Sequence, residues 1–157
     1  MVWHKWHSDS LKHSIFVWLA LRGGLKTADA LLLRNIQVPK TCSLCNEHEE
    51  SVSHLFECCY SFNILCALIP CMQSLLLRPN ILQVFDWMKV VFKGRPVVLN
   101  FYKLVCCCMI YFIWKERNNR HFRNKFMCYT SLFLYIKRVI FEKVMSWGNS
   151  MELLECL

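Results

Sequence analysis

The sequence predicts an all-α protein, a small helical bundle, and two observations carry this prediction. Apolar residues recur at helical spacing through most of the chain, which favours amphipathic helices over strands. The 157 residues include only four glycines and four prolines, too few for the many turns of a β-rich fold. This length suits one domain, or one domain with an extension, and is sufficient to bury a core.

The first helix is expected over residues 11–22. Apolar residues, among them Ile15 and Trp18, recur there at helical spacing and are predicted to form the buried face. Gly23 and Gly24 follow this stripe. Because glycine adopts the left-handed conformation of a helix C-cap without steric penalty, the pair is predicted to end the helix.

Thr27 is expected to cap a second helix that ends at Leu33 or Arg34. A threonine hydroxyl at this position can accept a hydrogen bond from a free backbone N–H of the first turn. Asp29 falls within that turn, where the positive end of the helix dipole favours a carboxylate.

Cysteine and histidine residues with the spacing of metal ligands follow the second helix. They form the pattern C-x2-C-x8-H-x3-C and are Cys42, Cys45, His54 and Cys58. Thiolate and imidazole groups suit Zn²⁺, and four protein ligands leave no open position for water. The pattern therefore predicts a structural Zn²⁺ site, in a loop that staples the second helix to the third.

The second half of this motif is expected to lie on the third helix. Residues four apart project from the same helix face, so His54 and Cys58 should point to the metal together. Ser51 or Ser53 is predicted to cap this helix, which is expected to continue to Ile69. Two alternative ligands remain open beside these, and they are His48 in the loop and Cys59 on the helix.

The second half of the chain is predicted to form further helices. Residues 70–80 contain two prolines and are expected to be a connector, with Asn80 as the cap of the next helix. Helices are expected over Ile81–Phe92, Pro96–Arg120 and Tyr129–Trp147, followed by a frayed tail from Gly148 to Leu157. We therefore divide the chain into a zinc-binding domain, residues 1–69, and a helical extension that packs on it, residues 70–157.

The longest of these helices contains an almost wholly apolar stretch, Val97–Trp114, interrupted by Asn100 and Lys103. A membrane-spanning helix needs about 20 apolar residues, and a lysine within it costs roughly 2–3 kcal/mol. The stretch is therefore predicted to be the central helix of a bundle, or a helix paired with another chain, rather than a membrane span. Three consecutive cysteines inside it, residues 106–108, point in different directions and are expected to be core residues.

The residues around the metal motif resemble those of a known family. In order, they include Phe-x-Trp-Leu from Phe16, Leu-x-Thr from Leu25, the C-x2-C pair, and His-Leu-Phe-x-Cys from His54. This set resembles the zinc-binding domain of reverse transcriptases from plant non-LTR retroelements, over about residues 3–66. Residues 113–120 are similar to the tail that commonly follows that domain.

The resemblance implies a zinc-binding accessory domain derived from a reverse transcriptase polyprotein. Such a domain is expected to bind nucleic acid, as RNA or an RNA–DNA hybrid, without catalysis. The alternative is a structural or protein-interaction module, an inactive relic of the retroelement that contacts a protein through apolar surface. No small-molecule substrate is expected.

The charge of the chain also favours a polyanionic partner. The formal net charge is +8, and half of it falls within one short segment near the end of the longest helix. The candidate nucleic-acid-binding residues of this segment are Trp114, Lys115, Arg117, Arg120, Arg123 and Lys125. Cations can neutralise phosphates and aromatic faces can stack unpaired bases. The alternative is a solvated helix end whose cations interact favourably with the helix dipole.

Cysteine usage and the N-terminal residues predict an intracellular location, nucleus or cytoplasm. The 11 cysteines lie mostly in apolar runs without the spacing of a disulfide scaffold, so free thiols in a reducing compartment are expected. The first residues lack the apolar core of a signal peptide. Trp3, His4, Trp6 and His7 are expected to form a linker that enters the domain.

No pattern in the sequence predicts catalysis. Template-directed polymerisation needs paired carboxylates that hold two divalent ions, whereas the three aspartates, Asp9, Asp29 and Asp86, are far apart. The sequence also has no phosphate-binding glycine loop and no nucleophile elbow. We therefore expect no polymerase, endonuclease or RNase H activity from these residues.

Overall fold

Helices account for all the regular elements in residues 8–74, 77–148 and 150–155, the parts that the computed structural model describes. No strand occurs within these ranges, where an isolated antiparallel bridge joins Thr41 to Glu49. The elements are α1 (Ser8–Leu21), α2 (Ala28–Leu32), α3 (Val52–Glu57), α4 (Cys59–Leu68), the 3-10 helix η1 (Pro70–Ser74), α5 (Ile81–Val91), α6 (Pro96–Arg123), α7 (Tyr129–Val144) and α8 (Ser150–Leu154). The prediction of an all-α fold is confirmed.

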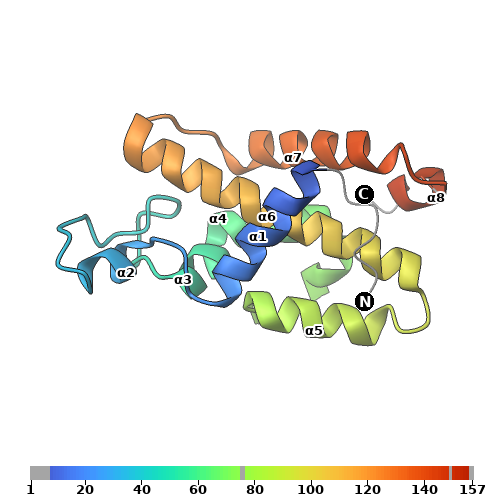
Figure 1. Cartoon of the computed structure of the whole chain (residues 1–157), viewed down its shortest axis with the longest axis horizontal. Helices are drawn as coiled ribbons and strands as arrows, with labels where there is room; N and C mark the ends of the chain where they lie inside the picture. Colours follow the sequence, from blue (N-terminus) through green and yellow to red (C-terminus); the bar gives the residue numbers. More distant parts are fainter. Residues whose placement is uncertain (1–7, 75–76, 149, 156–157) are drawn as a thin grey trace.

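The other helices are arranged around α6 (Figure 1). Helix α1 crosses it, α7 runs along one side of it, and α5 packs on it from the other side. Helix α4 packs against both α6 and α7. The loop that contains the metal motif lies at one end of this arrangement, beside the C-terminal end of α6. One cluster of buried hydrophobic side chains contains residues from both predicted domains, 1–69 and 70–157. The division into two domains stays a prediction.

Helix α6 is buried on almost all sides, as its composition predicts. Within the described residues it is the one helix long and apolar enough to cross a membrane, and 67% of its most apolar window is buried inside the bundle. Core helices of soluble proteins have the same properties, and its non-membrane character stays a prediction. Cys106, Cys107 and Cys108 are all buried in the core, and burial raises the pKa of the Cys107 and Cys108 thiols to about 12.

The predicted end of the first helix is confirmed. Gly23 has a φ of +64°, the left-handed conformation that glycine adopts most easily. The Gly24 N–H donates to the Leu19 carbonyl at 2.8 Å, and the Gly23 N–H donates to the Ala20 carbonyl at 3.2 Å. These two hydrogen bonds form a Schellman motif, which satisfies carbonyls at the end of α1.

The predicted apolar face of the first helix is wrong in part, because Phe16 and Leu19 pack against the core but two other members do not. Ile15 and Trp18 are 55% and 56% exposed, whereas His13 and Val17 face the core. Apolar residues occur on both sides of α1, so periodicity alone does not select the face. Packing against α6 selects the buried face. On this face, the centroid of the His13 ring lies 4.6 Å from that of Tyr111 in α6.

The second helix is shorter than predicted and is capped differently. It ends at Leu32, and its N-cap residue, Thr27, makes no side-chain hydrogen bond to the backbone of the first turn. The Thr27 hydroxyl instead donates to the carboxylate of Asp29. The Ala28 and Asp29 N–H groups donate to Glu50, from a distant part of the sequence, and the Ala30 N–H donates to the Asp29 carboxylate.

The third predicted helix is broken in two at Cys58. Ser51 caps α3 as expected, and its hydroxyl accepts a hydrogen bond from the His54 N–H at 3.1 Å. Cys58 then has an extended backbone, with ψ of 160°, and α4 starts at the next residue. The Ser61 hydroxyl donates to the Leu55 carbonyl at 2.6 Å across this break. The expectation that both ligands lie on one helix face is therefore wrong.

The remaining helices mostly follow the prediction. Asn80 and Gln83 form a capping box at the start of α5, and Pro96 occupies the first turn of α6. Helix α6 ends at Arg123, three residues later than predicted, where Asn124 takes a left-handed conformation. The predicted frayed tail is wrong for its described part, because Ser150–Leu154 forms α8 and buries Leu153.

Candidate metal centre and the polar network around it

Four side chains converge at the loop between α2 and α4. One ligand atom from each of Cys42, Cys45, His54 and Cys58 lies within 4.8 Å of the others. The Cys45 Sγ and His54 Nε2 atoms are 3.2 Å apart. Ligand atoms around a tetrahedral Zn²⁺ are expected to lie about 3.5–4 Å from one another. The longest distance between ligand atoms in this cluster is slightly greater than that. The predicted four residues are thus brought together.

The first two cysteines lie on a tight turn. The Asn46 N–H donates to the Cys42 carbonyl at 2.8 Å, and Asn46 takes a left-handed conformation with φ of +58°. The Cys42 N–H in turn donates to the His48 carbonyl at 2.8 Å, next to the bridge between Thr41 and Glu49. This backbone holds the Cys42 and Cys45 side chains on the same side of the turn.

The other two ligands are positioned by the break between α3 and α4. His54 lies in α3, immediately after the turn that Ser51 caps. Cys58 is at once the C-cap of α3 and the N-cap of α4. The Cys58 Sγ lies 3.6 Å from both the Leu55 carbonyl and the Ser61 hydroxyl, contacts that orient the thiol.

The electrostatics of the cluster favour a bound cation. The hydrogen bond between Cys42 and Cys58 lowers the pKa of the Cys58 thiol to about 5, and the same contact, together with burial, raises the pKa of Cys42. Cysteine binds a metal as the thiolate, so a divalent cation at the cluster would displace the thiol protons and neutralise the buried negative charge. Three sulfur donors and one imidazole fit Zn²⁺ and fill a tetrahedral shell. A shell of four protein ligands has no open position for water, as in structural sites.

The two alternative ligands lie outside the cluster. The His48 side chain is exposed, and its ring centroid is 5.3 Å from that of His54. Cys59 starts α4 and is half-buried, next to Cys58 in sequence but not among the converging ligand atoms. Both line a shallow hollow at the edge of the site.

Arg120 connects the cysteine turn to α6. Its Nη1 atom donates to the carbonyls of Ser43 and Leu44, the two residues between the first two cysteines, at 3.0 and 3.1 Å. Its Nε atom donates to Glu116 at 2.7 Å, and its guanidinium lies 4.6 Å from the ring centroid of Tyr60. The turn that carries two ligands is therefore held by a side chain from 75 or more residues later in the chain.

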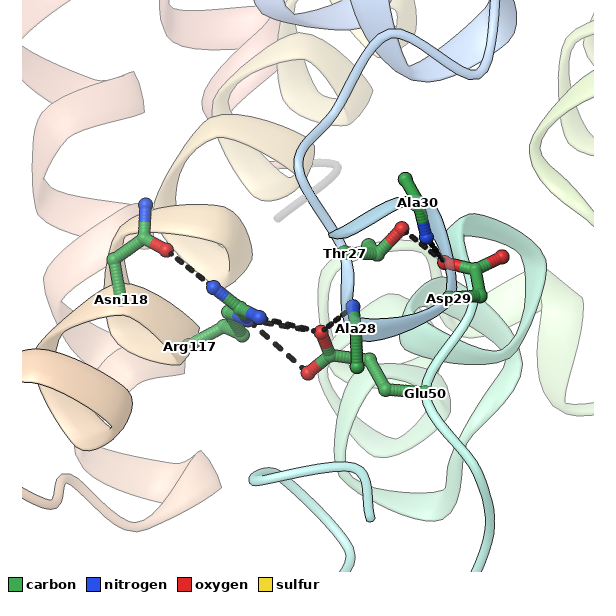
Figure 2. Close-up of polar contacts among 7 residues, drawn as sticks. All are labelled: Thr27, Ala28, Asp29, Ala30, Glu50, Arg117 and Asn118. Carbon is green, nitrogen blue, oxygen red and sulfur yellow. Dashed lines mark hydrogen bonds and ion pairs between the residues drawn. The ribbon is translucent and has the colours of Figure 1, made fainter. Parts of the chain in front are cut away.

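A buried ion pair makes a second connection between the loop and α6 (Figure 2). The Arg117 Nη2 atom lies 2.6 Å from Oε1 of Glu50, and the two side chains are 1% and 2% exposed. The same oxygen accepts a hydrogen bond from the Ala28 N–H at 2.9 Å. The Glu50 carboxylate thus caps α2, where the helix dipole favours a negative charge. Arg117 also donates to the amide oxygen of Asn118 at 3.0 Å.

These contacts change the interpretation of the predicted nucleic-acid-binding residues. Trp114 and Arg117 are buried, and Arg120 is engaged by internal hydrogen bonds. The exposed members of the predicted set are Lys115, Arg123 and Lys125. A buried ion-paired arginine cannot contact a phosphate unless the fold opens. The predicted nucleic-acid-binding surface is therefore reduced from six residues to three.

Two functional residues were missed by reasoning from the sequence, Glu50 and Glu116. Each is a buried acid that pairs with an arginine of α6. A signal existed in the sequence for Glu116, because it is the single acid in a strongly basic segment. Glu50 stands in a polar loop beside other acids, and Glu50-Ser51 belongs to the residues that resemble the known family, but nothing in the sequence pairs Glu50 with Arg117.

Comparisons with known proteins give one match. No curated protein and no solved structure matches the chain significantly. The match is to a family of accessory, non-catalytic domains, and it contains all four residues of the cluster. Residues 1–64 match the family zf-RVT, described as zinc-binding in reverse transcriptase, so this part of the chain is similar to a reverse transcriptase zinc-binding domain.

Proposed function

We propose that this chain is a zinc-binding accessory module, derived from the reverse transcriptase polyprotein of a plant non-LTR retroelement, that binds nucleic acid without catalysis. The convergence of Cys42, Cys45, His54 and Cys58 carries the proposal. The match of residues 1–64 to the family of reverse transcriptase zinc-binding domains supports it. The zinc orders the loop and holds it against α6, and the chemistry of the module is structural.

The nucleic-acid part of the proposal is supported by the distribution of charge. Lys115, Arg123 and Lys125 are exposed at the C-terminal end of α6, the end that lies beside the metal loop. The whole chain has a formal net charge of +8. Exposed cations on a basic protein attract phosphates, and RNA or an RNA–DNA hybrid is the partner that we propose.

The first experiment measures metal and binding together. Purified protein is analysed for zinc, and its binding to a short fluorescent single-stranded RNA is followed by anisotropy over a series of salt concentrations. We expect one zinc per chain and an affinity that falls steeply with salt, because each neutralised phosphate releases condensed counterion. Protein without zinc, or without measurable RNA binding at low salt, would contradict the corresponding half of the proposal.

A set of variants then locates the contact. Replacement of Lys115, Arg123 and Lys125 by alanine should flatten the salt slope by roughly two units if three single-strand phosphate contacts are lost. The matched control replaces three exposed cations that precede the N-terminus of α6, Lys89 in the last turn of α5 and Lys93 and Arg95 in the turn that follows, and should leave the slope unchanged. Equal slopes for the parent and the first variant would show that this end of α6 is only solvated.

A second candidate function is supported by the surface of α7. Leu134, Phe141 and Met145 are exposed and recur at i, i+7 and i+11, which places them on one face of the helix. An exposed apolar stripe of this kind suits a protein partner. In that case the zinc content would be unchanged and RNA binding would be absent, which separates the two candidates in the same experiment.

A further inference from the structure

An open groove lies between α1 and the C-terminal half of α6, apart from the metal centre. Its volume is about 360 Å³, within the ~300–1,000 Å³ range of small-molecule sites. Half of its lining residues are aromatic, with Phe16 from α1 and Tyr111, Trp114 and Phe122 from α6, and the other half are polar or charged. The metal centre leaves this groove without a role, whereas three of its lining residues, Trp114, Lys115 and Arg123, belong to the predicted nucleic-acid-binding set.

The groove has a positive edge. Lys115 and Arg123 both line it, and no carboxylate is found among its described lining residues. Positive charges beside aromatic rings, without a competing acid, suit an anion attached to a flat aromatic group. A nucleotide is a ligand of this kind, because its base can stack on an aromatic ring while the positive side chains neutralise its phosphate.

One polar side chain in the groove has a fixed orientation. Arg117 has only donor groups, so the Asn118 amide must turn its oxygen toward Arg117, and Figure 2 shows the amide nitrogen directed away. The Arg117 guanidinium is itself held by Glu50, because Nη2 donates to Oε1 and Nε donates to Oε2. The lining residue Asn118 therefore offers an N–H donor, which can bind a carbonyl oxygen or ring nitrogen at the edge of a base.

The aromatic rings of the groove are not equivalent. The Arg117 guanidinium covers Trp114 at 5.1 Å from the ring centroid, and Trp114 is only 9% exposed. Phe122 is 70% exposed. The ring of its neighbour His121 contacts it edge-on, and the two ring centroids are 4.6 Å apart. Phe122 is therefore the ring with a face available for stacking, and Trp114 forms the floor.

We infer that this groove binds one unpaired base of a single-stranded nucleic acid. The base stacks on Phe122, its polar edge accepts a hydrogen bond from the Asn118 amide, and Lys115 and Arg123 neutralise the flanking phosphates. The inference rests on the proposed nucleic-acid function and narrows it, because it selects single-stranded RNA over an RNA–DNA hybrid, which is a duplex. A duplex keeps its bases stacked and cannot supply one to the groove without losing pairing energy.

Substitution of Phe122 tests this on the zinc-loaded full chain. Phe122→Leu keeps an apolar side chain at an exposed position but removes the ring, so folding and zinc content should not change. We expect single-stranded RNA binding to weaken roughly five- to 150-fold, the loss typical of one base–aromatic stack. Binding of the duplex of the same sequence should stay constant, and Phe122→Trp should retain the parent affinity. Phe141→Leu, at an exposed phenylalanine on α7, is the matched control and should have no effect.

A small probe separates a base site from a general anion site. Adenosine monophosphate should shift the NMR signal of the Asn118 side-chain amide in the parent and not in Phe122→Leu, while ribose 5-phosphate should leave it in place. Equal shifts from both compounds, or no shift from adenosine monophosphate at millimolar concentration, would overturn the base site. If Phe122→Leu binds RNA as the parent does, the groove proposal fails while the proposed function stands. Absence of RNA binding by the parent contradicts the proposed function, and the nucleotide titration then decides the groove separately.

Discussion

The Arg117 guanidinium on α6 and the Glu50 carboxylate in the metal loop lie 2.6 Å apart with almost no exposure to solvent. The pair joins residues 67 positions apart in the chain, and Glu50 also caps α2 through the Ala28 N–H. A charge buried this deeply is tolerated only when its partner and further hydrogen bonds are present. The fold of the residues that match the zinc-binding family therefore depends on a helix outside that match.

Removal of one partner of this pair should destabilise the protein strongly. Arg117→Met leaves the Glu50 carboxylate buried and uncompensated, and we expect the free energy of unfolding to fall by about 3–5 kcal/mol. Adding Glu50→Gln to this variant removes the charge but keeps an amide oxygen for the Ala28 N–H, and should recover part of the loss. Urea denaturation of the zinc-loaded protein measures both.

The chain offers a matched surface pair as the control. Arg138 lies 3.0 Å from Glu142 on α7, and both side chains are mostly exposed. Surface pairs at this spacing contribute about 0.3–0.5 kcal/mol, so Arg138→Met should change stability by no more than this. Similar losses for Arg117→Met and Arg138→Met would show that the buried pair does not anchor the loop.

A second prediction concerns the metal affinity. Arg120→Ala removes the donors to the Ser43 and Leu44 carbonyls, and so releases the turn that carries Cys42 and Cys45. We expect roughly ten-fold weaker zinc binding, the lower end of the effect of losing an outer contact at a metal site. Competition with a chromogenic chelator measures it. Arg123→Ala, an exposed cation one turn further along α6, should keep the parent affinity, and an unchanged affinity in Arg120→Ala would refute this role.

Removal of the metal should unfold the loop but not the whole bundle. Metal binding contributes on the order of 10 kcal/mol to comparable zinc peptides, so chelation should largely melt residues 36–66. Hydrogen exchange followed by mass spectrometry should show faster exchange there and at the C-terminal end of α6, which the loop contacts through Arg117 and Arg120. Helix α5 packs on α6 away from the loop and should exchange at its parent rate. Unchanged exchange over residues 36–66 would rule out a metal-dependent fold.

Local sequence signals predicted most of the helices and the metal cluster. Gly23, Ser51 and Asn80 act through neighbours a few residues away, and all three caps are found where the sequence places them. The four metal ligands are likewise set by short spacings. Each of these features depends on interactions that a short peptide segment already contains, so periodicity and spacing are sufficient to find them.

The features that the sequence did not predict depend on contacts between distant segments. The buried side of α1 is selected by packing on α6, and the cap of α2 comes from Glu50 rather than from Thr27. Arg117 and Arg120 carry the same charge as Arg123, and only the position of two buried acids makes the first two internal. A basic segment therefore indicates an attractive surface, but it cannot show which of its cations are already paired.

The last prediction concerns the reactivity of the thiols. Cys128 is exposed at the N-cap of α7, and the hydrogen bond between its sulfur and the Ser131 hydroxyl lowers the pKa of its thiol below the ordinary 9.0. The pKa of the Cys71 thiol is instead raised, because the thiol is partly buried even though Cys71 is an exposed residue. Because the thiolate is the nucleophile, Cys128 should react first with iodoacetamide at neutral pH, and the three core cysteines at 106–108 last.

Peptide mapping by mass spectrometry over a time course checks this order in zinc-loaded protein. Ser131→Ala removes the side-chain hydrogen bond to the Cys128 sulfur at 3.1 Å, so it should raise the thiol pKa and slow alkylation there without changing the rate at Cys71. Cys156 lies outside the described residues and is replaced by serine in both proteins. Equal rates at Cys128 and Cys71 in the parent would mean that the Ser131 contact does not stabilise the thiolate, and early labelling at 106–108 would mean that α6 is not the core of the bundle.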